Sequence, residues 1–252
     1  GYFMNRVEAI LKAKGKKLIG WDEILDGGIS PEATVMSWRG IKGGIEASKM
    51  GHDVVMTPTT FAYLDYVQGE RTVDPPIYAS LRLNKCYSFE PVPDGVEAKY
   101  ILGGQGNLWT EQVPNLRHAQ YMTYPRAWAL AEVYWSPKET KSWDSFIKRV
   151  ENQFERSDIA EVNYAKAIYD PVIITSLKDG KLTFTIETEA PGLEVYFTID
   201  DAMPDTFSPK YSQPVVLPEG QITLRLRTYR DGKSIGNLVS LKREELERRA
   251  TR

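Results

Sequence analysis

The chain has 252 residues, 42% of them hydrophobic and 26% charged, which is ordinary for a globular protein of one large domain or two smaller ones. Its net charge is −2, with lysine and arginine spread along the sequence, so we expect neither a nucleic-acid partner nor binding to an anionic membrane. Cys86 is the only cysteine, which excludes an internal disulfide, and no apolar run is long enough to span a bilayer.

The sequence opens directly on a predicted helix. Apolar residues recur at helical spacing from Phe3 to Leu11, and Gly15 follows where a left-handed cap belongs. Because no methionine, loop or signal-peptide pattern precedes this helix, we expect the chain to be part of a longer protein.

Several apolar runs then carry an aromatic residue and a charged residue at their ends. Helical sequence, as at residues 43–50, separates them, and this alternation predicts parallel strands joined by right-handed crossovers. Aromatic and acidic residues at the carboxyl ends of parallel strands are typical of the mouth of a barrel, where they indicate a polar, flat-faced ligand such as a sugar. The runs are KLIGWDEILD at 17–26, TVMSWRG at 34–40, VVMTPTTFAYLD at 54–65 and YILGGQGNLWTE at 100–111.

Residues 66–99 interrupt this rhythm with four prolines and little periodicity. A loop of that length inside a compact domain is usually functional. Helical sequence returns after Glu111, with a proline-containing capping box at 136–139 and an amphipathic stripe over 143–154.

The pattern changes after Pro171 to short runs with alternating or β-branched residues, which predicts a small antiparallel β-sandwich. These runs lie at 172–175, 181–187, 194–200 and 221–229. We therefore divide the chain into an α/β domain at 1–169, a sandwich at 170–241 and a charged tail at 242–252. For the tail we expect only a solvated helix or a frayed end.

Three tryptophans, Trp21, Trp38 and Trp109, stand at strand ends beside polar residues. Large aromatic residues mostly serve cores, but indoles also stack on the C–H faces of sugars, and several converging indoles would form a slot for one pyranose. Tyr63 alternates with Asp65 along its strand and therefore faces the same way. Its phenol would donate to a carbonyl or hydrogen-bond a neighbouring loop.

The acidic residues offer two arrangements. Asp22 and Glu23 have the composition of a general acid/base pair, but neighbours on a strand point to opposite faces, so we expect one of them to point away. Asp65 and Glu111 follow separate strands and can converge on sugar hydroxyls or form salt bridges at the rim. Both histidines are isolated, so no spacing predicts a metal or cofactor, and the glycines at 103–106 are interpreted as room at a crowded barrel top.

The chain resembles glycoside hydrolase family 20, the β-N-acetylhexosaminidases, particularly of the Bacteroides-like bacterial type. Residues 2–163 resemble the second half of its catalytic barrel, and residues 171–240 resemble the sandwich that often follows. The resemblance implies an α/β fold: the second half of a (β/α)8 TIM barrel followed by an Ig- or fibronectin-like antiparallel β-sandwich. The segments that carry it, in family order, are GWDEIL, VMSWRG, TFAYLDY, GGQGNLWTE and YPRAWALAEVYWS.

The resemblance also implies roles for individual residues. The three tryptophans would line the pocket for a terminal N-acetylhexosamine, and Tyr63 would donate its hydroxyl to the acetamido carbonyl oxygen. Asp65 and Glu111 would hold the 4- and 6-hydroxyls of the sugar. In that family the acetamido oxygen of the substrate attacks the anomeric carbon and gives an oxazolinium intermediate with retention, so the implied activity is that of an exo-β-N-acetylhexosaminidase without cofactor or metal.

One part of the family pattern has no match here. The general acid of the family is a glutamate after an aspartate in an H-x-G-G-D-E segment, and this sequence contains neither that segment nor the sugar-binding arginine of the first barrel half. We therefore expect the chain alone to be inactive and the catalytic pair to lie upstream, in a parent protein expected in the periplasm or secreted. Half a barrel leaves open edges on the strands of Leu18 and Leu102, so we expect self-association through them or a disordered half.

Other interpretations of the same residues stay open. The chain could be a non-catalytic carbohydrate-binding module, in which the tryptophans bind sugar, or a purely structural fragment without a ligand. A third interpretation makes Asp22 or Glu23 the acid of an unrelated barrel hydrolase. The linkage and the choice between glucosamine and galactosamine forms are also left open.

Overall fold

The computed structural model describes residues 1–74 and 77–251. By contacts between Cα atoms it divides into two compact units. The first, here the barrel unit, comprises Gly1–Asp65 and Leu83–Asn163; the second, here the sandwich unit, comprises Tyr66–Arg82 and Tyr164–Arg252. The predicted boundary at 169/170 thus lies a few residues inside the second unit, which also takes in part of the proline-containing loop.

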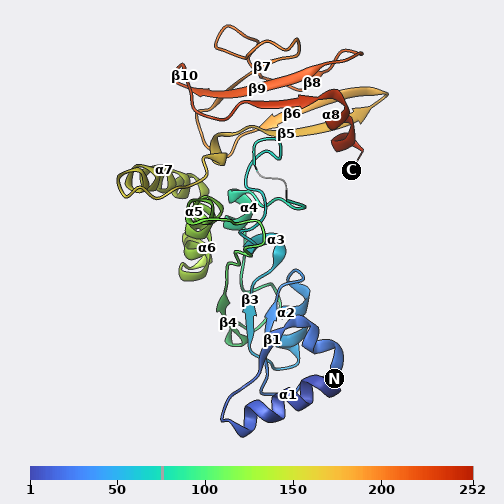
Figure 1. Ribbon diagram of the computed structural model, residues 1–252, viewed down its shortest axis with the longest axis vertical. Helices are drawn as coiled ribbons and strands as arrows, with labels where there is room; N and C mark the ends of the chain where they lie inside the picture. Colours follow the sequence, from blue (N-terminus) through green and yellow to red (C-terminus); the bar gives the residue numbers. More distant parts are fainter. Residues whose placement is uncertain (75–76, 252) are drawn as a thin grey trace. The chain divides into compact units, whose positions relative to one another are not determined.

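A four-stranded parallel sheet forms the centre of the barrel unit, and each strand pairs with the next along the chain (Figure 1). Its inner strands are built from buried apolar residues such as Val35, Val54 and Met56. Parallel pairing with helical sequence between strands confirms the predicted alternation. The strands are β1 (Ile19–Trp21), β2 (Thr34–Ser37), β3 (Val54–Met56) and β4 (Ile101–Gly104).

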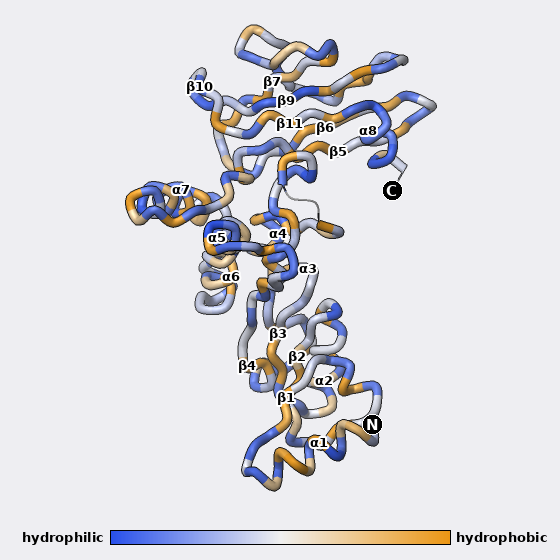
Figure 2. Tube along the Cα trace, in the orientation of Figure 1, coloured by the Kyte–Doolittle hydropathy of each residue, from blue (hydrophilic) through white to orange (hydrophobic). Residues whose placement is uncertain are grey.

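The helices of the barrel unit connect and flank these strands. The longest, α7, begins after Ser142, whose side chain accepts a hydrogen bond from the Ser145 backbone N–H. Figure 2 shows apolar and polar residues alternating along α7, as the stripe at 143–154 predicted. The capping box predicted at 136–139 does not open this helix: it gives a short 3-10 turn, because Lys141 adopts an extended conformation and a second cap follows.

The helix bounds in the barrel unit are as follows: α1 (Tyr2–Ala13), α2 (Lys42–Lys49), α3 (Thr59–Ala62), α4 (Leu83–Tyr87), α5 (Leu116–Thr123), α6 (Arg126–Trp135) and α7 (Trp143–Ile159). Short 3-10 helices are η1 (Asp22–Gly27), η2 (Ala98–Tyr100) and η3 (Lys138–Thr140). No helix in the described part of the chain is both long and apolar enough to cross a membrane.

The sandwich unit contains two antiparallel sheets, as predicted, with more strands than the sequence indicated. The additional strand β11 alternates buried and exposed residues, with Val239 and Leu241 in the core. One sheet has the order β5-β6-β8, with β5 (Val172–Lys178), β6 (Lys181–Glu187) and β8 (Val215–Val216). In the other, β9 (Thr223–Arg230) pairs with β7 (Glu194–Thr198), β10 (Lys233–Ser234) and β11 (Val239–Lys242); η4 (Ala167–Tyr169) precedes both sheets.

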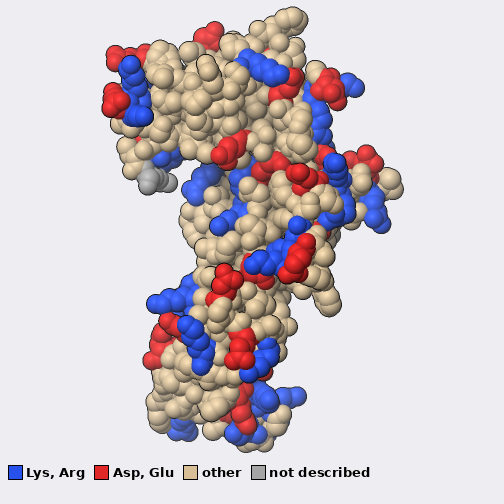
Figure 3. All heavy atoms as spheres, turned by 180° about the vertical axis from the view of Figure 1, so that it is seen from behind, with Lys and Arg blue, Asp and Glu red and all other residues tan. Residues whose placement is uncertain are grey.

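The charged tail differs from the expectation of a solvated or frayed end. It forms helix α8 (Arg243–Ala250), and Leu246 is 0% exposed within the core of the sandwich. A single large apolar residue gives no helical periodicity, so the sequence could not show that this helix packs. Figure 3 shows acidic and basic side chains interspersed on the face drawn, in agreement with a net charge of −2.

Candidate active site

The structure brings the predicted aromatic residues together at the carboxyl ends of the parallel strands. The ring centroids of Trp21 and Trp109 are 5.9 Å apart, and those of Tyr63 and Trp109 are 6.4 Å apart. Trp38 stacks on Tyr63 at 6.4 Å with an interplanar angle of 24°. Tyr63 is buried, whereas Trp109 is 42% exposed, so this ring cluster has a closed base and an open rim.

Trp38 is held in place by the two acids that follow β1. Asp22 is 1% exposed, and its Oδ2 accepts hydrogen bonds from the backbone N–H groups of Trp38 (3.0 Å) and Arg39 (3.1 Å). Its Oδ1 accepts from Arg39 Nε at 2.6 Å. Glu23 Oε2 accepts from the indole Nε1 of Trp38 at 2.9 Å.

This geometry corrects the expectation that one of the two acids points away. That expectation assumed a strand, but β1 ends at Trp21 and Asp22 opens the 3-10 helix η1, in which neighbouring side chains need not alternate. Both carboxylates therefore reach the same segment, Trp38–Arg39. Their hydrogen bonds position a ring of the cluster, which argues against either acid as the general acid of an unrelated hydrolase.

Asp65 presents a carboxylate oxygen that has no hydrogen-bond partner in the described residues. The side chain is 9% exposed, and its Oδ1 is the buried, unpaired atom. Burial is the largest cause that raises the pKa of Asp65 above 3.8, and the negative charge of Glu111 adds to it. A hydrogen bond with the backbone of Asp65 itself, the positive charge of Arg126 and a hydrogen bond with the Trp109 backbone oppose this rise in the pKa. Asp65 thus lies beside the ring cluster with one carboxylate oxygen that is buried and has no hydrogen-bond partner among the described residues.

Two residues that the sequence reading did not single out fix the backbone around Asp65. Arg126 is 0% exposed, and its Nη2 donates to the carbonyl oxygens of Leu64 (2.5 Å) and Met122 (2.7 Å). Asn107 accepts from the Leu64 N–H through its backbone oxygen at 2.6 Å. Arg126 stood in the segment YPRAWALAEVYWS, where an arginine among apolar residues is the signal of a paired, buried charge.

Two of the three glycines at 103–106 have the role that the sequence predicted, whereas a Cβ on Gly103 would meet nothing within 4 Å. A Cβ on Gly104 would lie 2.2 Å from the ring of Tyr134, and a Cβ on Gly106 would lie 2.9 Å from Leu130. Side chains at these positions would therefore collide with helix α6, which confirms the interpretation of crowding.

A parallel α/β sheet with an aromatic site at the carboxyl ends of its strands is consistent with part of a barrel of the TIM type. The chain belongs to glycosyl hydrolase family 20, because the catalytic-domain model of that family matches residues 1–138. The model described as Fn3 associated matches residues 184–242. These matches confirm the predicted family and the fold, part of a TIM barrel followed by a sandwich.

Individual relatives agree with this assignment. A β-hexosaminidase of Porphyromonas gingivalis is 37% identical over 257 residues, which cover 98% of this chain and 32% of that protein. The solved exo-β-N-acetylglucosaminidase of Vibrio harveyi, in complex with N-acetylglucosamine, is 31% identical with a TM-score of 0.58, over 65% of this chain and 27% of that one. The N-acetyl-β-hexosaminidase of Streptomyces plicatus is 26% identical with a TM-score of 0.61, over 66% and 35% of the two chains. The chain thus spans about a third of the length of the curated relatives that match most of it.

Proposed function

We propose that this chain supplies the sugar-binding wall of an exo-β-N-acetylhexosaminidase that removes terminal, non-reducing N-acetylhexosamine residues from glycans. The observation that carries the proposal is the ring cluster of Trp21, Trp38, Tyr63 and Trp109 with the unpaired carboxylate oxygen of Asp65 beside it. Indole faces and a carboxylate acceptor together suit a single sugar ring. The names of the relatives in the family support the same substrate class.

In the proposed mechanism the acetamido group of the substrate is the nucleophile, as in other substrate-assisted glycosidases. Trp38 and its neighbours hold the sugar ring, and Tyr63 donates a hydrogen bond to the acetamido carbonyl oxygen. That bond aligns the oxygen with the anomeric carbon before the glycosidic bond breaks, which is catalysis by positioning. Asp65 and Glu111 accept hydrogen bonds from the 4- and 6-hydroxyls, and a general acid outside the matched segments protonates the leaving oxygen.

Binding and chemistry can be tested separately on this chain. N-acetylglucosamine should change the tryptophan fluorescence, and Trp38→Ala should weaken its binding by about tenfold or more, the effect of losing one stacking ring. Trp135→Ala is the matched control, because Trp135 is exposed and lies outside the cluster.

Hydrolysis is measured with an aryl N-acetylglucosaminide. The chain should release no more chromophore from this substrate than its Tyr63→Phe variant does. If no sugar-dependent signal is seen, a purely structural fragment is favoured. If the chain binds the sugar but the parent protein has no hydrolase activity, a non-catalytic module is favoured.

Sugar binding should also be lost as the pH falls. The loss should occur at a higher pH than it would if Asp65 had the pKa of an ordinary aspartate. Because burial raises the pKa of Asp65, its carboxylate takes up a proton earlier as the pH falls, and a protonated carboxyl is a weaker acceptor for hydroxyls. Titration of N-acetylglucosamine at several pH values measures this acid limb. Asp65→Asn should bind weakly at every pH and lack the limb; an unchanged limb in that variant would contradict the assignment.

We further propose that the chain self-associates through the edge strands of its parallel sheet. Among the described residues, strands β1 and β4 have a neighbour on one side only, and Ile19 and Leu102 on these strands are exposed. Leu102→Lys should shift the chain towards monomer in sedimentation velocity, because charge on an edge strand opposes pairing. Leu177→Lys, on an exposed position of β5, is the control. A wild-type chain that is monomeric with protected β1 and β4 amides would count against the proposal.

A further inference from the structure

Within the barrel unit, the segment that follows β4 is joined to the segment that carries Tyr63 by one buried asparagine. Asn107 is 6% exposed and forms an isolated parallel bridge with Tyr63. We propose that Asn107 and its partner Thr57 are positioning residues, which fix the place of the Tyr63 phenol and thereby select sugars that carry an acetamido group. The inference rests on the proposed function, in which Tyr63 donates to the acetamido carbonyl oxygen.

The backbone of Asn107 holds the chain on both sides of Tyr63. Its N–H donates to the Ala62 carbonyl at 2.8 Å, and its carbonyl accepts from the Leu64 N–H at 2.6 Å. Ala62 and Leu64 are the immediate neighbours of Tyr63, so the position of its Cα and the direction of its side chain depend on the position of Asn107. A displacement of Asn107 would therefore displace the phenol.

The side chain of Asn107 fixes this residue in turn. Its Nδ2 donates to Thr57 Oγ1 at 2.5 Å, and its Oδ1 accepts from Gln105 Nε2 at 2.6 Å. Thr57 is 0% exposed, so the loss of its hydroxyl would leave the Asn107 amide without that acceptor in a buried place. The Thr57 N–H donates to the carbonyl of Ser37, the last residue of β2, at 3.0 Å. The amide is therefore tied to the ends of β2 and β3.

These hydrogen bonds also reach the two rings that flank Tyr63. Trp38 follows Ser37 directly and stacks on Tyr63. Trp109 lies two residues after Asn107, and its ring centroid is 6.4 Å from that of Tyr63. The phenol is thus held in place before a ligand arrives, so a hydrogen bond from its hydroxyl costs less conformational entropy than one from a mobile side chain.

The expected consequence of this positioning is selectivity among sugars. Indole faces stack on any pyranose, whereas the hydroxyl of Tyr63 is directed at the acetamido group alone. Loss of positioning should therefore weaken the binding of N-acetylglucosamine more than that of glucose, which lacks this group. The ratio of the two affinities, measured on one variant, is independent of the fraction of the chain that is folded.

The test measures this ratio by tryptophan fluorescence in variants of the full chain. Thr57→Val removes the hydroxyl that accepts from Asn107, and the ratio of N-acetylglucosamine to glucose affinity should fall about three- to tenfold. Asn107→Ala should have the same effect. Thr57→Ser supplies a hydroxyl again and should retain most of the ratio.

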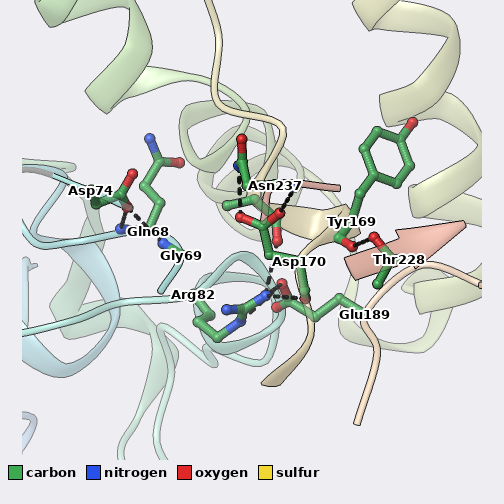
Figure 4. A network of polar contacts seen from close by, with 10 residues as sticks. Gln68, Gly69, Asp74, Arg82, Tyr169, Asp170, Glu189, Thr228 and Asn237 are labelled. Carbon is green, nitrogen blue, oxygen red and sulfur yellow. Dashed lines mark hydrogen bonds and ion pairs between the residues drawn. The ribbon is translucent and has the colours of Figure 1, made fainter. Parts of the chain in front are cut away.

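Thr228→Val is the matched control. Thr228 is also 0% exposed, and its Oγ1 donates to the Tyr169 carbonyl at 2.5 Å, as Figure 4 shows, but both residues belong to the sandwich unit. The same chemical change is thus made at the same degree of burial, away from the hydrogen bonds of Asn107. The affinity ratio should be unchanged in this variant.

Double variants decide whether the effect passes through the phenol. Tyr63→Phe removes the hydroxyl itself, so the addition of Thr57→Val or Asn107→Ala to Tyr63→Phe should lower the ratio no further. A further fall, or an unchanged ratio in the folded single variants, would overturn the inference.

Failure of the proposed function gives a different result. In that case the wild-type chain binds neither sugar, or Tyr63→Phe leaves the ratio unchanged. Amide hydrogen exchange of Leu64 then still decides whether Thr57 and Asn107 hold the Tyr63 segment, because exchange should be faster in Thr57→Val and unchanged in Thr228→Val. Equal exchange in Thr57→Val and the wild-type chain would overturn the inference as well.

Discussion

Replacing Asp22 by alanine should lower the free energy of unfolding of the barrel unit by about 3–5 kcal/mol, because two backbone N–H groups lose a buried carboxylate acceptor and an unsatisfied group costs about 1–3 kcal/mol. Asp22 is 1% exposed and accepts from two backbone N–H groups and from Arg39 Nε. Without it, the backbone N–H groups of Trp38 and Arg39 lose their acceptor. Urea unfolding followed by tryptophan fluorescence measures the change.

Asp26→Ala is the matched control for this variant. Asp26 lies on the same 3-10 helix and approaches the same Arg39 at 3.8 Å, but its side chain is 71% exposed. An exposed pair of that kind contributes about 0–1 kcal/mol, so Asp26→Ala should leave the unfolding curve almost unchanged. Equal effects of the two substitutions would show that the buried hydrogen bonds of Asp22 do not fix the Trp38 segment. N-acetylglucosamine binding by Asp22→Ala should weaken as well, since Trp38 belongs to the ring cluster.

Replacing Arg126 by methionine should be about as destabilising, again about 3–5 kcal/mol, because a fully buried guanidinium and its hydrogen bonds are lost. The carbonyl oxygens of Leu64 and Met122 would lose their donor. Methionine retains much of the volume, so the loss reports hydrogen bonding and charge more than a cavity. Thermal or urea unfolding measures the effect, and Arg117→Met, on an exposed position of α5, should be nearly neutral.

The same variant should change the pH dependence of both stability and binding. The charge of Arg126 lowers the pKa of Asp65, so its removal should raise that pKa further. A carboxyl whose pKa is raised by folding disfavours the folded state above that pKa, and the penalty disappears as the pH falls through it. Arg126→Met should therefore recover part of its lost stability on acidification, while its acid limb of sugar binding moves to higher pH. A pH-independent loss of stability, with an unmoved limb, would show that Arg126 does not act on Asp65.

Together these contacts show that the acidic residues around the ring cluster have different partners. Asp22 and Glu23 hold Trp38 through its backbone and its indole. Asp65 carries the unpaired oxygen that suits a ligand. The carboxylates thus divide into those that position a ring and one with an oxygen that has no hydrogen-bond partner among the described residues, a division set by their partners and not by their type.

The sequence alone determined the family, the order of the strands and the residues of the ring cluster. These features are local: an apolar run of a few residues defines a strand, and the aromatic residue at its end is placed by the direction of that strand. Parallel strands wound in order then bring Trp21, Trp38, Tyr63 and Trp109 to one end of the sheet.

The tertiary structure alone decided which unit holds residues 66–82, the packing of α8 and the tasks of Asp22 and Glu23. The pair of Glu70 and Arg249 joins residues 179 positions apart, and neither residue differs in its local sequence from an exposed charge. Helix α8 likewise packs through Leu246 and the small Ala250, too few apolar residues to set a period. Local patterns report which face of an element is apolar, whereas the partner of a buried charge is fixed only when distant segments meet.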